Sequence, residues 1–551
     1  LGVASSSKNC KKVLEAAGLL HYFETRVDGM VSAELGLKGK PEPDIFTTAC
    51  DNLGVAYDRS VVVEDAVSGV QAGAKGGFGL TLGLDREGNR EALEKNGADM
   101  VLNDISELGG IPALERWFDT RVEELKWNLI YRDYNLEKEM SREALLTVGN
   151  GFFATRGSME EVAANESNYP GSYMAGLYNR RKSKLGDRWV ENEDFVNFIN
   201  WLPVTFRLSG EEWFDPNKHS FKLEERRLDL KTGILYRSLV VNHKNGLKTR
   251  VESRRFVSMD NPHIAGLEYR ILPLNYSDEL EVCSSIDGDL INDGVKRYRE
   301  LDQHHLEQVG QGRLDETGYV LVKTNQSDIY ILVSEKLTLL HGSKKIAASD
   351  FQSEKGRIKT IFNLKVKKGE SIELKKLVSV RNSRDFETID PNRIFAVPEL
   401  DKNSFDVLLL RSAKAWEKIW QKADMQVSGD RYSQMLLRLH IYHLFTTASP
   451  HNSNLDTAVP ARGLHGEAYR GHIFWDQMYV LPFYTFHFPE ITRSALLYRY
   501  HRLPKAREYA KEHGFEGAMF PWQSGSDGRE ETQVLHLNPV SGKWGEDYSS
   551  L

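Results

Sequence analysis

The chain has 551 residues, a length that predicts about three or four domains at roughly 150 residues each. Its formal charge of −7 is mild for this length, so the composition gives no support for a nucleic-acid or anionic-membrane partner. Hydrophobic residues make up 40% and charged residues 27%, which excludes a disordered chain and allows a large core.

Neither a membrane segment nor a covalent framework is indicated. The mean hydropathy is −0.47, and no uninterrupted apolar run approaches the roughly 18 residues of a membrane-spanning helix. The three cysteines, Cys10, Cys50 and Cys283, lie far apart and form no CxxC pair, so a disulfide framework or zinc cage is not expected. With no signal-peptide pattern at the start, these features predict a cytoplasmic protein.

Residues 1 to about 110 alternate short apolar runs with helical stretches. The runs 61–63 and 79–83 are predicted strands, and the segments 44–53 and 66–74 are predicted helices. This alternation predicts an α/β domain in which helices cover a parallel sheet. Functional groups in such sheets lie at the carboxyl ends of the strands.

From about residue 126 to 395, alternation with a period of two dominates. The clearest case joins the runs 238–243 and 247–257 through Asn245-Gly246, which is a strong hairpin signal. Similar runs at 319–323, 329–333 and 372–380 indicate a large antiparallel β-sandwich.

From about residue 402 the pattern becomes helical. Apolar residues recur at three- and four-residue spacing over 405–423, 432–447, 491–501 and 506–513. Only about 125 residues follow position 426, too few for twelve helices, so a closed helical barrel here would be incomplete. The first residue is Leu1, in what reads as the second half of a buried strand, and 544–551 ends without a helix cap. We therefore expect a piece of a longer protein, cut at both ends.

Three motifs near the start occur together in a characteristic order. They are Val3-Ala-Ser-Ser-Ser-Lys-Asn9, Gly39-Lys-Pro-Glu-Pro-Asp-Ile-Phe46 and Val61-Val-Val-Glu-Asp-Ala-Val-Ser-Gly-Val-Gln-Ala-Gly73. Singly, each has an ordinary explanation as a turn or a helix N-terminus. Together they resemble the haloacid-dehalogenase (HAD) superfamily, and within it the β-phosphoglucomutase-like branch.

This resemblance implies roles for five residues. Ser5 and Ser6 would hold a phosphoryl group, and Lys40 would bind it and neutralise the charge that develops on it during catalysis. Glu64 and Asp65 would hold Mg²⁺, a hard cation that prefers carboxylate oxygens.

The nucleophile of that superfamily is not found in this region. It is the first Asp of an Asp-x-Asp motif on an upstream strand, and no such motif occurs in residues 1–110. Asp287-Gly-Asp289 fits superficially, but it lies in the β-rich region and we interpret it as a turn. The domain as given is therefore not expected to form an aspartyl-phosphate.

A second set of motifs runs through the rest of the chain. The matching stretches are Leu145-Leu-Thr-Val-Gly-Asn-Gly-Phe-Phe-Ala-Thr-Arg-Gly157, Tyr169-Pro-Gly-Ser-Tyr-Met-Ala-Gly-Leu-Tyr178, Arg462-Gly-Leu464, Gly471-His-Ile-Phe-Trp-Asp476 and Gly517-Ala-Met-Phe-Pro-Trp-Gln-Ser524. They resemble glycoside hydrolase family 65, which includes phosphorylases of maltose, trehalose and kojibiose and also some hydrolases. The resemblance implies an N-terminal β-sandwich, a helical linker and an (α/α) barrel of six helix pairs.

The two resemblances and the patterns together predict a multidomain chain. Its fold class is an α/β Rossmann-like HAD fragment, then an antiparallel β-sandwich, then the start of an (α/α) barrel. The predicted domains are 1–115, which is HAD-like and lacks its first strand and cap, 120–395, the sandwich, 396–430, the helical linker, and 431–551, the beginning of the catalytic barrel.

Tryptophans and a carboxylate suit sugar chemistry. Indole faces stack on the apolar faces of glucose and carboxylates accept from its hydroxyls, so Trp475 and Asp476 form a predicted glucose-binding pair. By resemblance, Trp522 and Gln523 line the neighbouring acceptor side. The chain has Trp-Gln where kojibiose-type phosphorylases carry Trp-Glu, and Gln477-Met478 where Thr-Glu is frequent, so the acceptor stays open. The alternative is that both tryptophans are core aromatics and Asp476 is a helix cap.

The general acid is predicted by position alone. Inverting glycosidases use an acid and a base, whereas in a phosphorylase the phosphate itself attacks and only the acid is needed. In the family that this region resembles, the acid is a Glu a few tens of residues past the Pro-Trp motif. This position favours Glu546 as the general acid, with Asp547 as the next candidate. The alternatives are that these two residues form a solvated loop and that the acid lies beyond residue 551.

These observations predict a carbohydrate-active enzyme that cleaves an α-linked glucose disaccharide of trehalose, maltose or kojibiose type with inversion. Phosphorolysis would give β-glucose 1-phosphate, which the β-phosphoglucomutase-like domain would convert to glucose 6-phosphate. Inorganic phosphate is then the co-substrate and Mg²⁺ the cofactor, with sugars and sugar phosphates as partners and a homodimer as the assembly that the resemblance allows.

Two alternatives stay open. One is a family 65 hydrolase of α-glucosidase or trehalase type joined to a HAD phosphatase. The other is an inactive carbohydrate-binding fragment. The sequence does not name the sugar linkage.

Overall fold

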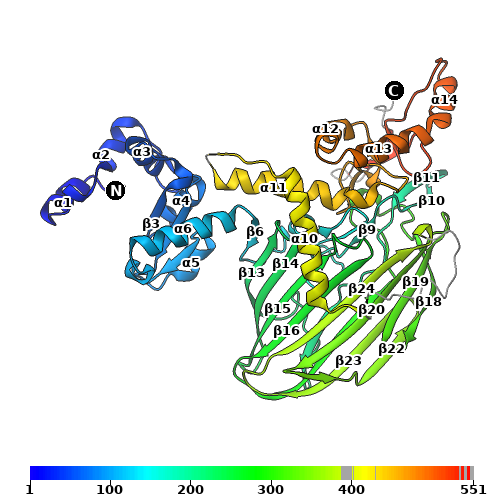
Figure 1. Ribbon diagram of the computed structural model, residues 1–551, viewed down its shortest axis with the longest axis horizontal. Coiled ribbons are helices and arrows are strands. Elements are labelled where there is room, and N and C mark those ends of the chain that lie inside the picture. The colour runs from blue at the N-terminus through cyan, green and yellow to red at the C-terminus, as the bar shows by residue number, and fades with distance from the viewer. Residues whose placement is uncertain (386–399, 401, 429, 533–534, 539–542, 547–551) are drawn as a thin grey trace. The chain divides into compact units, whose positions relative to one another are not determined.

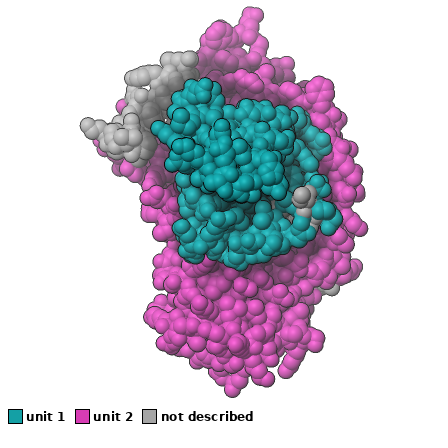
Figure 2. Space-filling model, turned by 90° about the vertical axis from the view of Figure 1, so that its left-hand side faces the viewer, with its two compact units in different colours: residues 1–129, 424–440 teal, residues 130–423, 441–551 magenta. Residues whose placement is uncertain are grey.

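The computed structural model describes the chain except residues 386–399, 401, 429, 533–534, 539–542 and 547–551 (Figure 1). Side chains at 111, 113, 117, 535–538 and 543–546 also lie outside the described part. The chain divides into two compact units. Unit 1 comprises residues 1–129 and 424–440, and unit 2 comprises residues 130–423 and 441–551 (Figure 2).

Unit 1 is an α/β unit with parallel strands, as predicted. Its described strands are β1 (Gly2–Ala4), β2 (Thr25–Val27), β3 (Val61–Glu64), β4 (Leu80–Leu84) and β5 (Met100–Leu102). Its helices are α1 (Cys10–Ala16), α2 (Gly29–Leu35), α3 (Asp44–Leu53), α4 (Val67–Lys75), α5 (Arg90–Lys95) and α6 (Ile111–Leu125), with short 3₁₀ turns η1 (Leu20–Tyr22), η2 (Tyr57–Arg59) and η3 (Ile105–Leu108).

The strands of unit 1 form two separate parallel sheets instead of the one sheet that the sequence predicts. β1 pairs with β2, and β3, β4 and β5 pair in that order. The two sheets share one core, because Val27 of β2 and Val62 of β3 pack in the same cluster as Phe46 and Phe78. No ladder joins β1 to β3 among the described strands. That a strand is lacking here stays a prediction.

Unit 2 contains the antiparallel sandwich. One sheet has ten strands, in the order β18-β19-β20-β24-β16-β15-β14-β13-β6 with β21 paired to β20, and the facing sheet has the order β12-β17-β23-β22. β19 contacts β17 and β23, which brings the two sheets face to face. The described strands, including β6 at the join of the two units, are β6 (Asn128–Tyr131), β7 (Val148–Gly149), β8 (Phe153–Thr155), β9 (Ser172–Met174), β10 (Tyr178–Leu185), β11 (Arg188–Phe195), β12 (Val204–Leu208), β13 (Phe221–Asp229), β14 (Ile234–Asn242), β15 (Lys248–Val257), β16 (Ile264–Pro273), β17 (Asp278–Asp287), β18 (Leu306–Leu314), β19 (Thr317–Thr324), β20 (Tyr330–His341), β21 (Lys344–Ile346), β22 (Asp350–Glu354), β23 (Arg357–Val366) and β24 (Ile372–Asn382).

The predicted hairpin is β14–β15. The two strands pair antiparallel from Asn242↔Lys248 to Leu235↔Arg255, and Gly246 in the turn has a φ of 74°, a conformation that favours glycine. Alternate residues such as Leu239 and Val251 are fully buried, which is the period-two pattern that predicted these strands. Asp287 ends β17, so the Asp-Gly-Asp triplet follows a strand as a turn does.

The last part of unit 2 is mostly helical, as expected. Its helices are α10 (Phe405–Ala423), α11 (Arg431–Thr447), α12 (Gln477–His487), α13 (Pro489–His501) and α14 (Leu503–Glu512), and its short turns are η6 (Pro450–Asn452) and η7 (Ala468–Gly471). The elements α7 (Glu139–Leu145), η4 (Lys296–Tyr298) and η5 (Ser383–Asp385) come earlier in the unit. α11 begins in unit 1 and ends in unit 2. Four two-to-four-residue strands complete it: β25 (Ile473–Phe474), β26 (Gln523–Ser524), β27 (Leu535–Asn538) and β28 (Lys543–Glu546). Among the described helices, none combines the length and apolar character that a bilayer crossing requires.

Candidate active site

The two predicted sugar-binding segments lie side by side. β25 pairs antiparallel with β26, so that Phe474 faces Gln523, and the residues just outside this pairing are Trp475 and Trp522. Their ring centroids are 5.6 Å apart, with the ring planes at 51°. Trp475 is 43% exposed and Trp522 is 55% exposed, so neither is a core aromatic. Two neighbouring indoles that face solvent suit a sugar ring.

Asp476 supplies an unsatisfied acceptor beside these indoles. It occupies the N-cap position of α12, but its side chain makes no capping hydrogen bond. Its Oδ1 atom is buried and has no hydrogen-bond partner in the described part of the chain, and the same holds for Oε1 of Gln477. Leaving a buried acceptor unpaired costs about 1–3 kcal/mol, so donors such as sugar hydroxyls fit this position.

A left-handed turn leads into the first of these segments. Tyr469, Arg470 and Gly471 have φ values of 54°, 55° and 64°. For residues other than glycine this conformation is unfavourable by roughly 1–2 kcal/mol each, and it persists only where the surroundings hold it. Arg470 is paired with Asp194 of β11, and a Cβ at Gly471 would collide with Phe195 of the same strand. We call residues 469–477 the donor segment.

The second segment is held by its own backbone and by acidic residues that follow it. Gln523 donates from Nε2 to the carbonyl of Glu531 at 2.7 Å, and the Glu531 amide donates back to the Gln523 carbonyl at 3.1 Å. The Trp522 amide donates to Glu530 Oε2 at 2.7 Å. We call residues 521–532 the acceptor segment.

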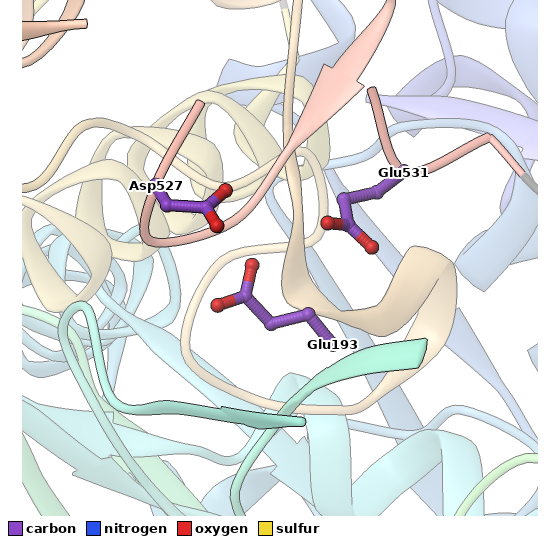
Figure 3. Close-up of side chains that lie close together, drawn as sticks. All are labelled: Glu193, Asp527 and Glu531. Atoms are coloured by element: carbon purple, nitrogen blue, oxygen red, sulfur yellow. The ribbon is translucent and has the colours of Figure 1, made fainter. Parts of the chain in front are cut away.

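Three carboxylates gather at the acceptor segment, as Figure 3 shows: Glu193, Asp527 and Glu531. Oxygen atoms of the three lie within 4.8 Å of one another, a spacing that could hold a cation. The guanidinium of Arg180 already contacts all three, with Nη2 at 3.3 Å from Glu193, 3.2 Å from Asp527 and 2.5 Å from Glu531. Burial raises the pKa of Glu193, and burial raises the pKa of Glu531 to about 7 despite Arg180.

The sequence patterns did not single out this cluster. Glu530 and Glu531 stand close after the Trp-Gln motif and could have been noticed as acidic neighbours of it. Arg180 precedes Glu531 by 351 residues, so no local sequence pattern predicts the ion pair between them.

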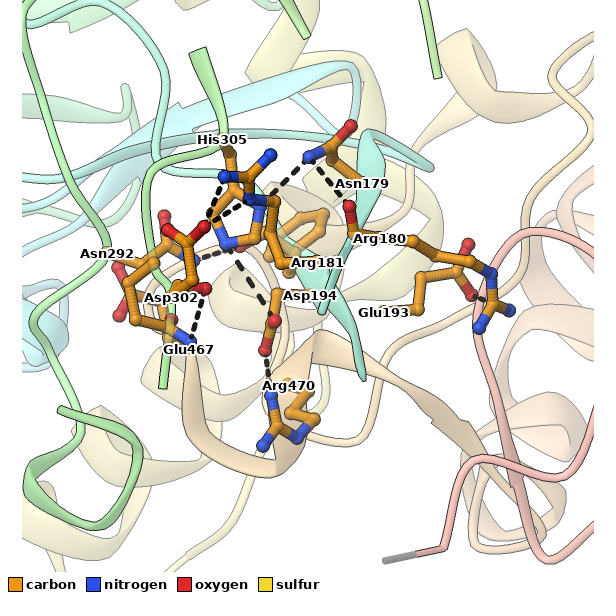
Figure 4. A network of polar contacts seen from close by, with 12 residues as sticks. Asn179, Arg180, Arg181, Glu193, Asp194, Asn292, Asp302, His305, Glu467 and Arg470 are labelled. Atoms are coloured by element: carbon orange, nitrogen blue, oxygen red, sulfur yellow. Dashed lines mark hydrogen bonds and ion pairs between the residues drawn. The ribbon is translucent and has the colours of Figure 1, made fainter. Parts of the chain in front are cut away.

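A buried carboxylate, Glu467, contacts the quoted motif 169–178 from a position between two others (Figure 4). Glu467 accepts hydrogen bonds from the hydroxyls of Tyr169 at 2.5 Å and Tyr173 at 3.0 Å, and from the amide of Gly294 at 2.9 Å. Burial raises its pKa to about 7, although these donors oppose the shift. The sequence analysis did not select Glu467 either.

The predicted general acid is described only by its backbone. Glu546 ends β28 and pairs with Leu535 of β27. Its side chain, and all of Asp547, lie outside the described residues.

In unit 1 the structure brings together three of the five predicted residues. Lys40 forms an ion pair with Glu64, and Asp65 acts electrostatically on Lys40 by raising its pKa, while burial lowers that pKa more strongly. Glu64 Oε2 also accepts from the amides of Asp65 and Ala66 at 3.1 Å. Ser5 and Ser6 follow β1 as predicted, but among the described residues no hydrogen bond joins either to Lys40.

Comparison with protein families identifies three matching regions. Residues 129–419 match the N-terminal domain of glycosyl hydrolase family 65, and residues 438–551 match the central catalytic domain of that family. Residues 1–77 match the haloacid dehalogenase-like hydrolases.

Several curated proteins are similar over most of this chain. An uncharacterized glycosyl hydrolase of Mycobacterium tuberculosis (strain H37Rv) is 38% identical over 428 residues, which is 77% of this chain and 32% of that protein. Kojibiose phosphorylase of Halothermothrix orenii is 32% identical and covers 74% of this chain and 51% of its own length. Trehalose 6-phosphate phosphorylase of Lactococcus lactis is 32% identical, with 75% and 52% covered. The chain therefore spans a third to a half of the length of these relatives.

A solved structure shares the fold. A protein from the human microbiome, provisionally named a kojibiose phosphorylase, superposes with a TM-score of 0.65 at 21% identity. The match covers 74% of this chain and 53% of that one. At this identity the likeness concerns the fold alone.

Proposed function

The chain belongs to glycosyl hydrolase family 65, and from this premise we propose that the whole protein cleaves an α-linked glucose disaccharide by phosphorolysis. The observation that carries the proposal is the paired exposed indoles Trp475 and Trp522 beside the unpartnered Oδ1 of Asp476. Relatives that are kojibiose and trehalose 6-phosphate phosphorylases support phosphorolysis over hydrolysis.

In the proposed reaction, Trp475 stacks on the glucose that is transferred and Asp476 accepts from its hydroxyls. Trp522 and Gln523 bind the departing sugar. Glu546, as the proposed general acid, donates a proton to the glycosidic oxygen while the bond from that oxygen to C1 breaks. An oxygen of inorganic phosphate attacks C1 from the opposite face, and the new C1–O bond gives β-glucose 1-phosphate.

For unit 1 we propose sugar-phosphate chemistry that consumes this product. Mg²⁺ usually takes one or two carboxylates and fills its remaining positions with water and phosphate oxygens, so Glu64 and Asp65 fit it. When bound, Mg²⁺ would neutralise phosphate charge. Lys40 would bind a phosphoryl oxygen, and the hydroxyls of Ser5 and Ser6 would donate to the same group.

The domain limits, the cellular location and the assembly of the protein are also proposals. We propose the domains 1–115, 120–395, 396–430 and 431–551, a cytoplasmic location and a homodimeric assembly. Coupling of the two chemistries in one protein is likewise a proposal, supported by the presence of both family matches in one chain.

The test uses the whole protein that contains this chain. It is incubated with kojibiose, trehalose, trehalose 6-phosphate, maltose and nigerose, with and without inorganic phosphate, and both glucose and glucose 1-phosphate are followed. We expect phosphate-dependent release of β-glucose 1-phosphate from one of them. Phosphate-independent release of glucose would make the protein a hydrolase, and binding without turnover of any sugar would make it a carbohydrate-binding protein.

Asp476→Asn tests the site itself. The amide keeps the size of the side chain but removes its charge, so we expect kcat/KM to fall by about 100-fold, in line with the ~3 kcal/mol of a charged hydrogen bond. Trp189→Ala is the control, because Trp189 is 68% exposed and belongs to the tip of the β10–β11 hairpin. Equal activity of Asp476→Asn and the wild type would remove Asp476 from the site.

A further inference from the structure

One strand of the two-stranded β10–β11 hairpin contacts both segments of the proposed sugar site. β11 ends with Glu193, Asp194 and Phe195, and successive side chains of a strand point to opposite faces. Glu193 therefore reaches the acceptor segment, while Asp194 reaches the donor segment (Figure 4).

Asp194 holds the left-handed turn of the donor segment. Its carboxylate pairs with the guanidinium of Arg470, and the side chains are only 4% and 2% exposed. Arg470 also lies over the ring of Tyr298, 4.1 Å from its centroid. Two further contacts fix the same turn: Tyr178 Oη donates to the Gly471 carbonyl at 2.6 Å, and His472 Nε2 lies 2.8 Å from the Glu193 carbonyl. Without the Asp194 charge, Arg470 would be a buried cation with no anion in contact, and the turn would lose the partner that offsets its strain.

Glu193 holds the acceptor segment by different atoms. It accepts from the Ser526 amide at 2.9 Å and also from the Ser526 hydroxyl. Gly525 lies so close that an added Cβ would collide with the Glu193 carboxylate. Arg180 of the paired strand β10 extends this contact to Asp527 and Glu531. The carboxylate thus fixes the chain at Ser526, four residues after Trp522.

We propose that Glu193 and Asp194 are positioning residues, each of which fixes one of the two sides of the sugar site. Asp194 sets the position of Trp475 and Asp476, and through them the binding of the transferred glucose. Glu193 sets the position of Trp522 and Gln523, and so the binding of the acceptor sugar. The assignment of the two sides rests on the proposed function.

The kinetic test runs the whole protein in the synthetic direction, with β-glucose 1-phosphate as donor and the reducing sugar of the best disaccharide as acceptor. In E193Q we expect the KM of the acceptor to rise at least tenfold and that of β-glucose 1-phosphate to change less than twofold. In D194N we expect the reverse. D187N is the matched control, because Asp187 makes the same charge change in the exposed turn of the same hairpin. Parallel changes of both KM values in each variant would overturn the proposal.

Amide hydrogen exchange tests the positioning without any assumed activity. Because the β25–β26 pairing links 473–474 to 523–524, exchange is compared outside it: E193Q is expected to accelerate exchange at least tenfold in residues 525–532 and leave 469–472 unchanged, and D194N is expected to do the opposite. Unchanged protection of β24 in the sandwich core shows that each variant is folded. If the wild type has no phosphorolytic activity but the exchange pattern is as expected, the proposed function fails and the positioning stands. Exchange that changes in neither segment, or in both, overturns the positioning.

Discussion

At the scale of single residues, several carboxylates of unit 2 are buried. Their hydrogen-bond donors are neutral groups, or a single guanidinium that several carboxylates share. Glu467 is the clearest case, because it is 5% exposed and its contacts are tyrosine hydroxyls and a backbone amide. The charged group that acts on it most, Asp194, is also negative. Such a site favours the protonated carboxyl, and this ties stability to pH.

We predict that the Glu467 carboxyl contributes stability to unit 2 that is lost as the pH rises from about 5 to 8, while buried histidines such as His472, whose pKa burial lowers to about 4, contribute with the opposite sign. The pKa of Glu467 is about 7 in the folded chain against 4.5 for an unperturbed glutamate, so the folded state binds the proton more tightly. The contribution is complete below the unfolded pKa and is lost as the pH passes the folded pKa, by about 3 kcal/mol for this group. Urea unfolding followed by tryptophan fluorescence at several pH values measures it.

Glu467→Gln should remove this downward contribution from the pH dependence of the free energy of unfolding, since the amide does not titrate in this range. Glu279→Gln, a change of the same chemistry at a carboxylate that is 62% exposed, should leave the wild-type slope in place. Glu531, whose pKa is also about 7, contributes with the same sign as Glu467, so the test is the difference between the pH profiles of the wild type and Glu467→Gln. A wild-type slope in that variant would contradict the account.

Sequence reasoning selected candidate residues that stand in short motifs and missed those that reach the candidate site from elsewhere in the chain. Trp475, Asp476 and Trp522 stand in short motifs with a residue type suited to sugars, and the structure brings the two tryptophans together. Arg180 of β10 and Glu193 of β11 stand in strands whose alternation says only which side chains face inward. Their partners lie more than 300 residues away, so only the fold could reveal them.

At the scale of elements, long periodic segments were predictable and very short ones were not. The expected helix 405–423 is α10, with the same limits, because its apolar face repeats over five turns. β25 and β26 have two residues each, which is too short for any period to appear, yet their pairing joins the donor and acceptor segments. Such short strands are determined by tertiary contacts and not by the local preference of their residues for a strand.

We predict that truncation of Trp416 in α10 strongly lowers the stability of unit 2. It is fully buried, stacks on Tyr442 with centroids 4.9 Å apart, and fills the space against Gly233, where a Cβ would collide with it. Trp416→Ala should lower the free energy of unfolding of unit 2 by about 3–5 kcal/mol, because the cavity cannot close. Chemical unfolding measures this. Leu410→Ala, at a position 56% exposed on the same helix, should change it by less than about 0.5 kcal/mol.

α12 carries three exposed apolar side chains. Met478 is 67%, Tyr479 75% and Phe486 85% exposed, and patches of this kind mark surfaces that bind other apolar groups. We predict that the 551-residue chain binds a hydrophobic fluorescent dye, and that Phe486→Ser lowers the bound fraction at least twofold. Leu314→Ser, at a residue 50% exposed in β18, serves as the control and should change little. Equal dye binding by both variants would place the exposed surface elsewhere.

At the scale of the whole molecule, groups suited to anions and metals are divided between the two units. In unit 1, Lys40 and Glu64 are in contact and Asp65 stands beside them with an exposed carboxylate. In unit 2 the described residues contain one cluster of three carboxylates with metal-like spacing, and Arg180 already occupies it. A divalent cation is therefore expected to serve the chemistry of unit 1 and not that of unit 2.

This division predicts that a chelator separates the two proposed activities. With the whole protein, disaccharide phosphorolysis should change less than twofold when EDTA removes divalent cations, because the sugar site uses indoles, Asp476 and a proton donor. Conversion of β-glucose 1-phosphate to glucose 6-phosphate should fall at least tenfold, because phosphate charge at Lys40 then lacks the cation that Glu64 and Asp65 would hold. Release of β-glucose 1-phosphate and formation of glucose 6-phosphate are measured in parallel, with EDTA saturated by Mg²⁺ as the control. Loss of phosphorolysis in EDTA would contradict this division, because it would mean that the carboxylate cluster of unit 2 binds a cation. Arg180 would then have to be displaced from Glu193, Asp527 and Glu531.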